Sequence, residues 1–454
     1  MGTKNYDNAT DLITFSRASG GTSLRKISYG SELLTNGTFD SDVSGWTLTN
    51  ISGTATFTQS SGEATFVRQA FGDKVSQAIT CVVGKVYEVS FEITDVSGGT
   101  CRARFNASNT STGTGAIADA TTASSLSSVV VADATTMYFV FDMNANGGSA
   151  TIDNISVKEV LFDQPDGTLT LFNHPDNIPR IDYNPDGTVK GLLVEEARTN
   201  LATYSEDVTN AAWTKTNLTA TSIDTLTLAA GTSTKTLVQI ISSSATGRTV
   251  SFEAKEGTHR YLQLYFDADA APWVTFDLRD GSISNSGTTV TGQSSPAPDG
   301  WFRYTVTTDS TTATNVSFAA TDIAATRRGV TASTGTLQLR RIQSEEGSFP
   351  TSYIPTSGST ATRAADIASI PVTDFGYNQD QGTVYVNGTF RDTETIVTVG
   401  STTLAADADG EKDYATTYSS DPSATSIELN GGTYENLQYY PRKLTAAQIT
   451  ELTT

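Results

Sequence analysis

The chain has 454 residues and a formal charge of −20, because 29 lysines and arginines stand against 49 aspartates and glutamates. At roughly 100–200 residues per domain, this length predicts about three domains. The negative charge repels phosphate backbones and anionic membrane surfaces, so we expect no nucleic-acid partner and no membrane insertion. The 76 threonines, β-branched residues that favour strands over helices, predict an all-β fold.

Residue types common in catalytic and metal sites are scarce in this sequence. His174 and His259 cannot build a multi-histidine metal site, and we expect each to hydrogen-bond a loop. Cys81 and Cys101 lack the Cys-x-x-Cys spacing of redox and zinc sites. We therefore expect no cofactor other than the calcium considered below, and we assign no catalytic residue. The sequence also has no secretory signal pattern and no run of about 18 apolar residues.

The N-terminal residues 1–31 form the first predicted segment. They are short and polar, but they contain the strand-like run Asp11–Phe15. We expect them to anchor the chain to a larger particle or to a neighbouring copy. From residue 32 the period-two alternation of strands begins, most clearly at Val86–Ile93. Other expected strands are Glu63–Ala70, Met137–Met143, Ala150–Val160, Trp301–Thr307 and Thr336–Ile342.

An internal repeat relates the two longest segments. Val89–Glu92 reads Val-Ser-Phe-Glu and recurs as Val250–Glu253, an offset of 161 residues. Arg104–Ala107 lies opposite Tyr265–Ala268 at the same offset, with no gap between the two matches. Loops are where insertions collect, so an unbroken match across a loop indicates two copies of one domain. The strand spacing predicts tandem jelly-roll β-sandwiches at 32–160 and 199–360.

Turn signals divide the rest of the chain. The connector 161–198 carries two Pro-Asp-Gly turns and should form a short hairpin. The two prolines within 347–356 predict an extended surface tail that closes the second sandwich. Residues 361–454 should form a small C-terminal β unit ending in a short helix, which begins at Thr445 because Thr445 and Gln448 have the spacing of a capping box.

Several sequence segments resemble those of known protein families. Pro179–Asn200 and Gln343–Thr356 resemble structural appendage proteins of tailed bacteriophages, namely tail or head fibres, spikes and decoration proteins. Residues 32–160, with Asn36–Phe39 and Trp46, resemble a jelly-roll carbohydrate-binding module. Tyr439–Gln448 resembles the end of concanavalin/laminin-G-like sandwiches. Fewer than 100 residues follow position 360, so we expect 361–454 to be an abbreviated version of that fold.

The carbohydrate-binding-module resemblance implies a structural calcium between the first and last strands. Its ligands would be Asp40 and Asp153, which offer the oxygen atoms that calcium prefers. The alternative interpretation is that both are solvated aspartates at turns or strand ends. The second copy places Arg340 near the position of Asp153, so we expect no equivalent metal there.

Glycan binding needs aromatic faces for stacking and polar groups beside them for hydroxyls. Tyr261, Gln263 and Tyr265 share one strand face, and Trp273 follows nearby. The alternative is that this face packs on a neighbouring domain or subunit. The corresponding face of the first copy carries three residues that would suit an acidic polysaccharide. These are Arg102, Arg104 and Asn106.

The resemblance implies a non-enzymatic virion protein, assembled in the host cytoplasm and released by lysis, that presents β-sandwiches to host surface polysaccharide. We expect other virion proteins to bind its N-terminal segment. Exposed sandwich edges favour a homo-oligomer, most simply a trimer. One alternative is a structural cement or connector protein without a ligand. A second is a polysaccharide-degrading tailspike enzyme, which would need two carboxylates about 5–10 Å apart.

Overall fold

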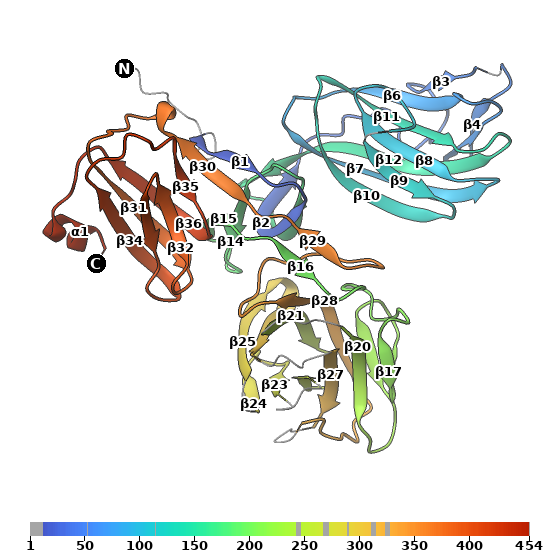
Figure 1. Cartoon of the computed structure of the whole chain (residues 1–454). Coiled ribbons are helices and arrows are strands. Elements are labelled where there is room, and N and C mark those ends of the chain that lie inside the picture. The colour runs from blue at the N-terminus through green and yellow to red at the C-terminus, as the bar shows by residue number, and fades with distance from the viewer. Residues whose placement is uncertain are drawn as a thin grey trace. The chain divides into compact units, whose positions relative to one another are not determined.

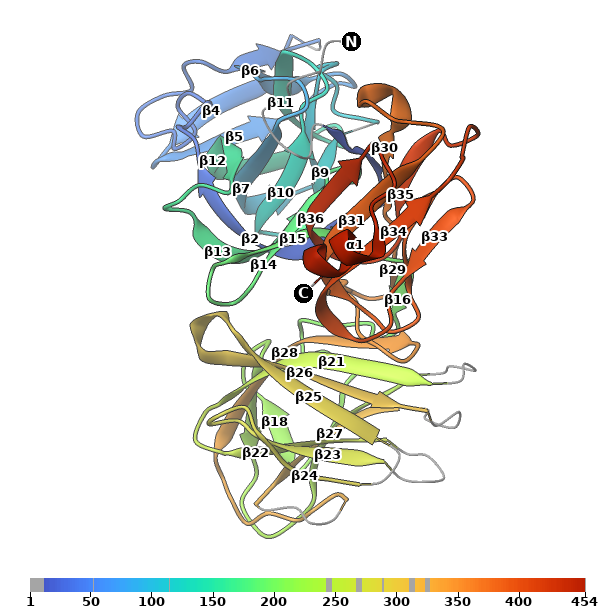
Figure 2. The same ribbon diagram turned by 90° about the vertical axis from the view of Figure 1, so that its left-hand side faces the viewer.

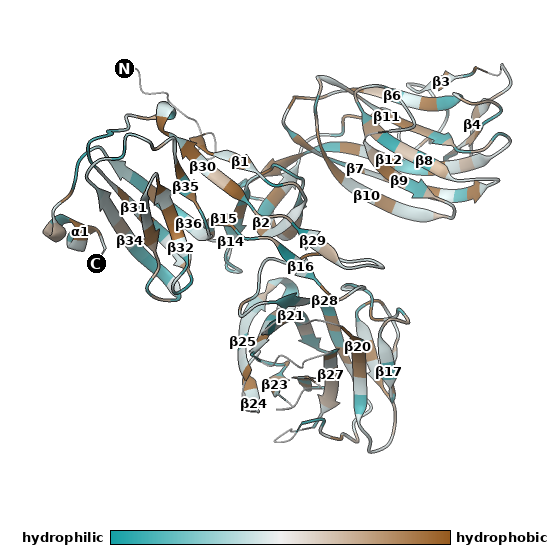
Figure 3. Cartoon of the chain, viewed as in Figure 1, coloured by the Kyte–Doolittle hydropathy of each residue, from teal (hydrophilic) through white to brown (hydrophobic). Residues whose placement is uncertain are grey.

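The computed structural model describes residues 12–51, 53–113, 115–241, 247–266, 272–287, 290–309, 315–322 and 327–453 (Figure 1). The fold is all-β, with antiparallel sheets and one short helix near the C-terminus, as the sequence predicts. Apolar and polar residues alternate along many strands (Figure 3), which places apolar side chains on one face of those strands. The chain divides into two compact units, Lys26–Thr168 and the remainder. No helix among the described residues is long and apolar enough to cross a membrane.

The first unit is a jelly-roll sandwich. One sheet has the strand order β10-β7-β12-β5-β4 and the other β3-β6-β11-β8-β9. Aromatic residues such as Phe66, Phe91, Phe139 and Phe141 fill the space between the sheets. Its strands are β3 (Thr47–Thr49), β4 (Thr56–Ser60), β5 (Glu63–Val67), β6 (Lys74–Thr80), β7 (Val86–Ser97), β8 (Cys101–Asn106), β9 (Ala116–Ala120), β10 (Ser124–Val131), β11 (Thr136–Met143) and β12 (Ser149–Phe162).

The second sandwich lies in the other unit, and its two layers are separated in Figure 2. One sheet has the order β18-β19-β28-β21-β26-β25 and the other β17-β20-β27-β22-β23-β24. Its strands are β17 (Thr214–Thr216), β18 (Leu218–Ala220), β19 (Thr225–Leu228), β20 (Lys235–Ile240), β21 (Arg248–Glu256), β22 (Tyr261–Tyr265), β23 (Trp273–Asp277), β24 (Ile283–Ser286), β25 (Val290–Ala297), β26 (Trp301–Thr308), β27 (Asn315–Thr321) and β28 (Thr336–Glu346).

The two sandwiches have the same strand order, as two copies of one domain would. Orders β10-β7-β12-β5-β4 and β26-β21-β28-β19-β18 correspond, and the second copy adds β24 and β25. Phe91 and Phe252 are both buried, as are Phe105 and Phe266. A bulge interrupts the pairing at the same place in both copies. It places Asn154 in the first copy and Arg341 in the second at φ 51°.

The C-terminal unit is a sandwich of two five-stranded sheets, which corrects the expectation of an abbreviated fold. One sheet has the order β1-β30-β35-β32-β33 and the other β14-β15-β36-β31-β34. Strands from the N-terminal segment and from the connector therefore complete it. The strands are β1 (Thr14–Ser16), β14 (Arg180–Tyr183), β15 (Val189–Val194), β30 (Ile367–Pro371), β31 (Gly382–Phe390), β32 (Thr395–Val399), β33 (Thr402–Ala405), β34 (Gly410–Tyr418), β35 (Ser426–Leu429) and β36 (Gly432–Tyr440).

The remaining elements link these sandwiches. They are β2 (Gly21–Tyr29), β13 (Thr168–His174), β16 (Arg198–Asn200) and β29 (Ala361–Arg363). Helix α1 (Ala446–Leu452) has the predicted capping box, in which Thr445 and Gln448 bond each other's backbone. Of the predicted anchoring segment, residues 1–11 lie outside the described residues, whereas β1 and β2 are paired into sheets rather than left as a free arm.

A buried cluster of charges joins the segments that build the C-terminal sandwich. Asp366 accepts hydrogen bonds from Arg17 (3.2 Å) and Arg180, and Arg180 also donates to Glu195 (2.9 Å). Arg363 Nη2 lies 3.5 Å from the Glu195 carboxylate. All five side chains are buried. Because buried charges are stable only when paired, this cluster fixes the three segments together.

The predicted surface tail at 347–356 is in fact largely buried. Tyr353 and Ile354 are only 2% and 5% exposed. The Tyr353 hydroxyl hydrogen-bonds the Ser205 hydroxyl at 2.6 Å, and Thr22 donates to the Tyr353 carbonyl. The expectation of an open tail is wrong. The prolines keep this segment out of a strand, but the apolar residues between them are still buried in the protein core.

Candidate functional site

The expected glycan-binding residues of the second sandwich lie on the outer face of the sheet that contains β22. Tyr261, Gln263 and Tyr265 alternate with Leu262 and Leu264, which belong to the core. Tyr265 is directly opposite Trp273 on β23 in the strand register. The structure thus brings together the residues that the sequence singles out.

This face is not open, which corrects the expected exposed platform. Gln263 and Tyr265 have no exposed surface, and Trp273 is 9% exposed. The guanidinium groups of Arg327 and Arg328 lie 5.0 and 4.9 Å from the centre of the Tyr265 ring. The Arg328 backbone N–H also donates to the Gln263 side-chain oxygen at 2.6 Å. Two arginines of the same chain therefore cover the aromatic surface.

Tyr261 lies at the edge of this face and is half-buried. The Arg260 guanidinium is 5.1 Å from the centre of its ring. Arg260 in turn pairs with Asp277, which the register places opposite Tyr261. Tyr261 is therefore the member of the predicted set that a ligand can reach without displacing Arg327 or Arg328.

Two buried hydroxyls beneath the arginines have no hydrogen-bond partner among the described residues. They belong to Tyr265 and to Ser317, which is opposite Tyr265 in the register between β22 and β27. Buried polar groups are nearly always hydrogen-bonded to protein or water, so an unpartnered buried hydroxyl indicates that a further group binds there. A ligand that carries hydroxyl groups would satisfy both. We call the group of Gln263, Tyr265, Trp273 and Ser317 the tyrosine–tryptophan site.

Sequence reasoning missed Ser317, Arg327 and Arg328. Ser317 lies on a strand that is distant in sequence and adjacent only through sheet pairing. Arg327 and Arg328 follow β27, where no periodic pattern signals their position. A short-range pattern shows which face a residue occupies but not which other segment covers that face.

The basic residues of the first copy are paired within the protein, which contradicts a free basic surface. Arg102 Nε donates to Asp142 at 2.8 Å. Arg104 Nη1 lies 2.7 Å from the Asp119 carboxylate. Asn106 bonds the backbone of Thr110 in both directions, at 2.8 and 3.2 Å. The sequence predicted the face correctly but not the acidic residues that neutralise it.

The proposed calcium ligands do not form a recognisable metal centre. Asp40 is exposed and accepts a bond from Thr38 at 3.1 Å. Burial raises the pKa of Asp153, and the nearby charges of Glu63, Glu92 and Asp40 raise it further. Within the described ranges no group of three or more histidine, cysteine or acidic side chains is arranged to hold a metal ion. The structural calcium therefore stays a prediction without support from the donor set.

The two histidines and two cysteines have structural roles. His174 lies 2.9 Å from the Ser23 hydroxyl, and His259 lies 3.0 Å from the Tyr261 carbonyl. Burial lowers the pKa of both rings. Cys81 and Cys101 are buried and not bonded to each other. Burial raises their thiol pKa values to about 11 and about 12, so neither is a reactive thiolate at neutral pH.

Comparison with solved structures finds carbohydrate-binding modules. One, described as "CBM4 structure and function", has 14% identity and a TM-score of 0.23 and covers 28% of this chain and 99% of that chain. The tandem CBM22-1–CBM22-2 domain of Paenibacillus barcinonensis Xyn10C has 12% identity and a TM-score of 0.23, covering 70% of this chain and 98% of that one. No family model and no curated protein matches the sequence. At these TM-scores the likeness carries no conclusion about function, so function is inferred from this chain's own residues.

Proposed function

We propose that the chain is a non-enzymatic glycan-binding protein and that the tyrosine–tryptophan site contacts the sugar. The observation that carries the proposal is the pair of buried, unpartnered hydroxyls of Tyr265 and Ser317 beside an aromatic surface. Tyrosine and tryptophan faces stack on the C–H surfaces of sugars, and the free hydroxyls match the hydrogen-bonding groups of a sugar. Arg327 and Arg328 must move away from the Tyr265 ring to admit the ligand.

That movement breaks the cation–π contacts of both arginines and the hydrogen bond that Arg327 Nη2 donates to the Phe266 carbonyl at 2.9 Å. A cation–π contact contributes about 0.5–2 kcal/mol. A sugar ring that replaces a guanidinium on the same aromatic face regains much of this stacking, and the displaced guanidinium regains water. The arginines therefore act as a weak cover, and each site should bind weakly. Several copies in one assembly would raise the total strength by increasing the effective concentration.

The wider biological setting is also a proposal. The resemblance of Pro179–Asn200 and Gln343–Thr356 to phage appendage proteins supports a fibre, spike or decoration protein of a virion, assembled in the host cytoplasm. In that setting the ligand is host surface polysaccharide, other virion proteins bind the N-terminal segment, and the chain forms a trimer. The cement alternative is favoured by one observation, namely that Tyr265 is fully covered in this structure.

The test uses Tyr265→Phe, which removes only the unpartnered hydroxyl and should leave stability nearly unchanged. Tyr304→Phe is the control, because Tyr304 is equally buried in the same sandwich but lies on the other sheet, and its hydroxyl already donates to the Asp277 carbonyl at 3.4 Å. Binding to purified host polysaccharide is measured by calorimetry or by adsorption of the assembled protein. We expect Tyr265→Phe to weaken binding about threefold to tenfold, the effect of one net hydrogen bond.

The double change Arg327→Ala with Arg328→Ala removes the cover and should strengthen binding. Equal binding by Tyr265→Phe and Tyr304→Phe would remove the tyrosine–tryptophan site from consideration. No binding of any polysaccharide by either the parent or the uncovered variant would favour the cement function. Release of reducing sugar by the parent protein would overturn the non-enzymatic interpretation.

A further inference from the structure

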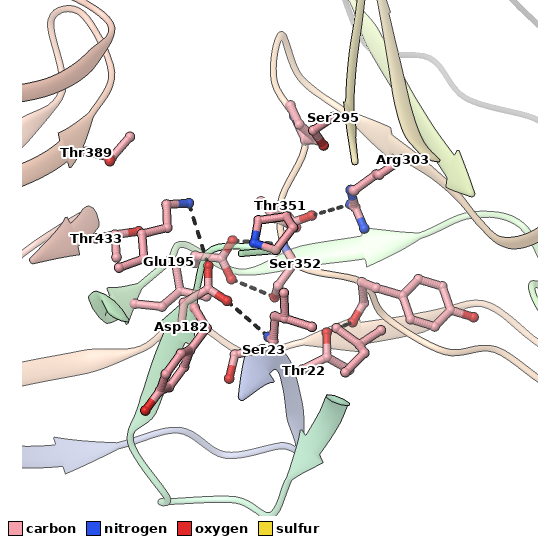
Figure 4. Close-up of a pocket in the computed structure, with 18 of the residues that line it drawn as sticks. Thr22, Ser23, Asp182, Glu195, Ser295, Arg303, Thr351, Ser352, Thr389 and Thr433 are labelled. Carbon is pink, nitrogen blue, oxygen red and sulfur yellow. Dashed lines mark hydrogen bonds and ion pairs between the residues drawn. The ribbon is translucent and has the colours of Figure 1, made fainter. Parts of the chain in front are cut away.

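A cavity lies in the unit that contains the second and C-terminal sandwiches, apart from the tyrosine–tryptophan site. Its volume is about 340 Å³, within the range of small-molecule sites. Figure 4 shows Ser295 and Arg303 of the second sandwich on one side and Thr389 and Thr433 of the C-terminal sandwich on the other, with Asp182 between them. None of the residues considered so far as sugar contacts lines this cavity.

Arg303 is the cation in the cavity whose charge is not matched. Its Nη2 donates to the Ser251 hydroxyl at 3.0 Å and to the Thr351 carbonyl at 3.2 Å, and within the described part of the chain it forms no ion pair. Glu253, its neighbour in the register, is instead bonded to Arg341 at 2.9 Å. A half-buried guanidinium with neutral partners retains the capacity to bind a carboxylate.

The lining also offers hydroxyls from both sandwiches and the carboxylates of Asp182, Glu195 and Glu253, of which Glu195 and Glu253 already pair with arginines of the chain. The side chains of Ser295, Thr389 and Thr433 make no hydrogen bond to other described residues. Asp182 accepts a bond from the Leu24 backbone at 3.0 Å, and its other oxygen lies 3.6 Å from Lys190. Hydroxyls both donate and accept, as the hydroxyl groups of a sugar require. Apolar surface comes from the prolines of the lining, Pro185, Pro296, Pro298 and Pro350.

We propose that this cavity binds an acidic sugar residue, with its carboxylate on Arg303 and its hydroxyls on Ser295, Thr389 and Thr433. The site is independent of the tyrosine–tryptophan site, because the two share no residue. The cavity fits an acidic sugar because it combines one guanidinium that forms no ion pair with several hydroxyls that make no hydrogen bond to described residues, around a volume of small-molecule size. A neutral sugar satisfies the hydroxyls but leaves Arg303 without its anion, so the cavity discriminates in favour of the acid.

The experiment uses the full chain with two probes, glucuronate and glucose, titrated by ligand-observed nuclear magnetic resonance. Arg303→Gln removes the guanidinium charge. Arg279→Gln is the matched control, since Arg279 belongs to the same sandwich, is exposed, and pairs with Glu256 at 2.8 Å away from the cavity. Ser295→Phe fills the cavity from an exposed strand position and provides a second variant that leaves Arg303 in place. Unfolding temperatures show that each variant is folded.

We expect glucuronate to bind the parent chain and Arg279→Gln equally, and to bind Arg303→Gln at least about tenfold more weakly, because a hydrogen bond to a charged group is lost. Ser295→Phe should also lose binding, and glucose should bind more weakly than glucuronate throughout. Tyr265→Phe should have no effect here, which separates this proposal from the first. Equal binding of the two probes, unchanged binding by Arg303→Gln, or no binding by the parent would overturn the proposal.

Discussion

The buried charge cluster leads to a sharp stability prediction for Asp366→Asn. This change keeps the shape of the side chain and removes one of the two negative charges that face Arg17, Arg180 and Arg363. Of the two carboxylates that form ion pairs with these arginines, only Glu195 then remains. Asp366 also accepts the Glu195 backbone N–H at 2.9 Å, an interaction that the asparagine oxygen can keep.

The expected cost follows from the burial of the partners. Arg17, Arg180 and Asp366 have side chains with no exposed surface. Removing one partner of a buried ion pair costs about 3–5 kcal/mol, because the other charge stays buried without compensation. The same change at Asp407, whose side chain is 70% exposed and pairs with Lys412, should cost far less, because solvent screens an exposed ion pair. Asp407→Asn is therefore the matched control.

Differential scanning calorimetry separates the two compact units if they unfold in separate transitions. Asp366→Asn should lower the transition of the unit that holds the cluster by roughly 6–10 °C, at about 2 °C per kcal/mol for a large unit. The transition of Lys26–Thr168 should not move. A shift for Asp366→Asn no larger than that for Asp407→Asn, or an equal shift of both transitions, would refute the reasoning.

Three further predictions concern acid, the thiols and one glycine. Burial alone would raise the pKa of Glu195, but Arg180 and Arg363 outweigh it and lower the pKa from 4.5 to about 2. The ionised Glu195 therefore stabilises the folded state by about 3 kcal/mol above pH 4.5, and this contribution should disappear as the pH falls towards 2. The midpoint of unfolding, measured as a function of pH, checks this. Cys81 and Cys101 should resist a thiol reagent at pH 8 in the folded protein, and both should react in denaturant. Gly191→Ala should weaken the β15–β36 pairing and speed hydrogen exchange there, since its φ is 123° and a Cβ would lie 2.1 Å from the Tyr434 carbonyl oxygen. Unchanged exchange at β15 would contradict that prediction.

The sequence by itself determined the local structure and the repeat. Alternation of apolar and polar residues predicted β7, β11 and β12 closely, since the side chains of a strand point to opposite faces in turn. The 161-residue offset predicted two sandwiches of the same strand order. Even the core position of Cys101 followed from its alignment with Leu262, and both are buried.

Only the tertiary structure decided which distant segments meet. The C-terminal sandwich is completed by β1, β14 and β15, and a pairing across hundreds of residues leaves no pattern within any one strand. Alternation placed Tyr265 on the outer face but could not show that Arg327 and Arg328 cover it. The physical reason is that periodicity records the direction of a side chain, whereas burial and charge pairing depend on what the folded chain brings against it.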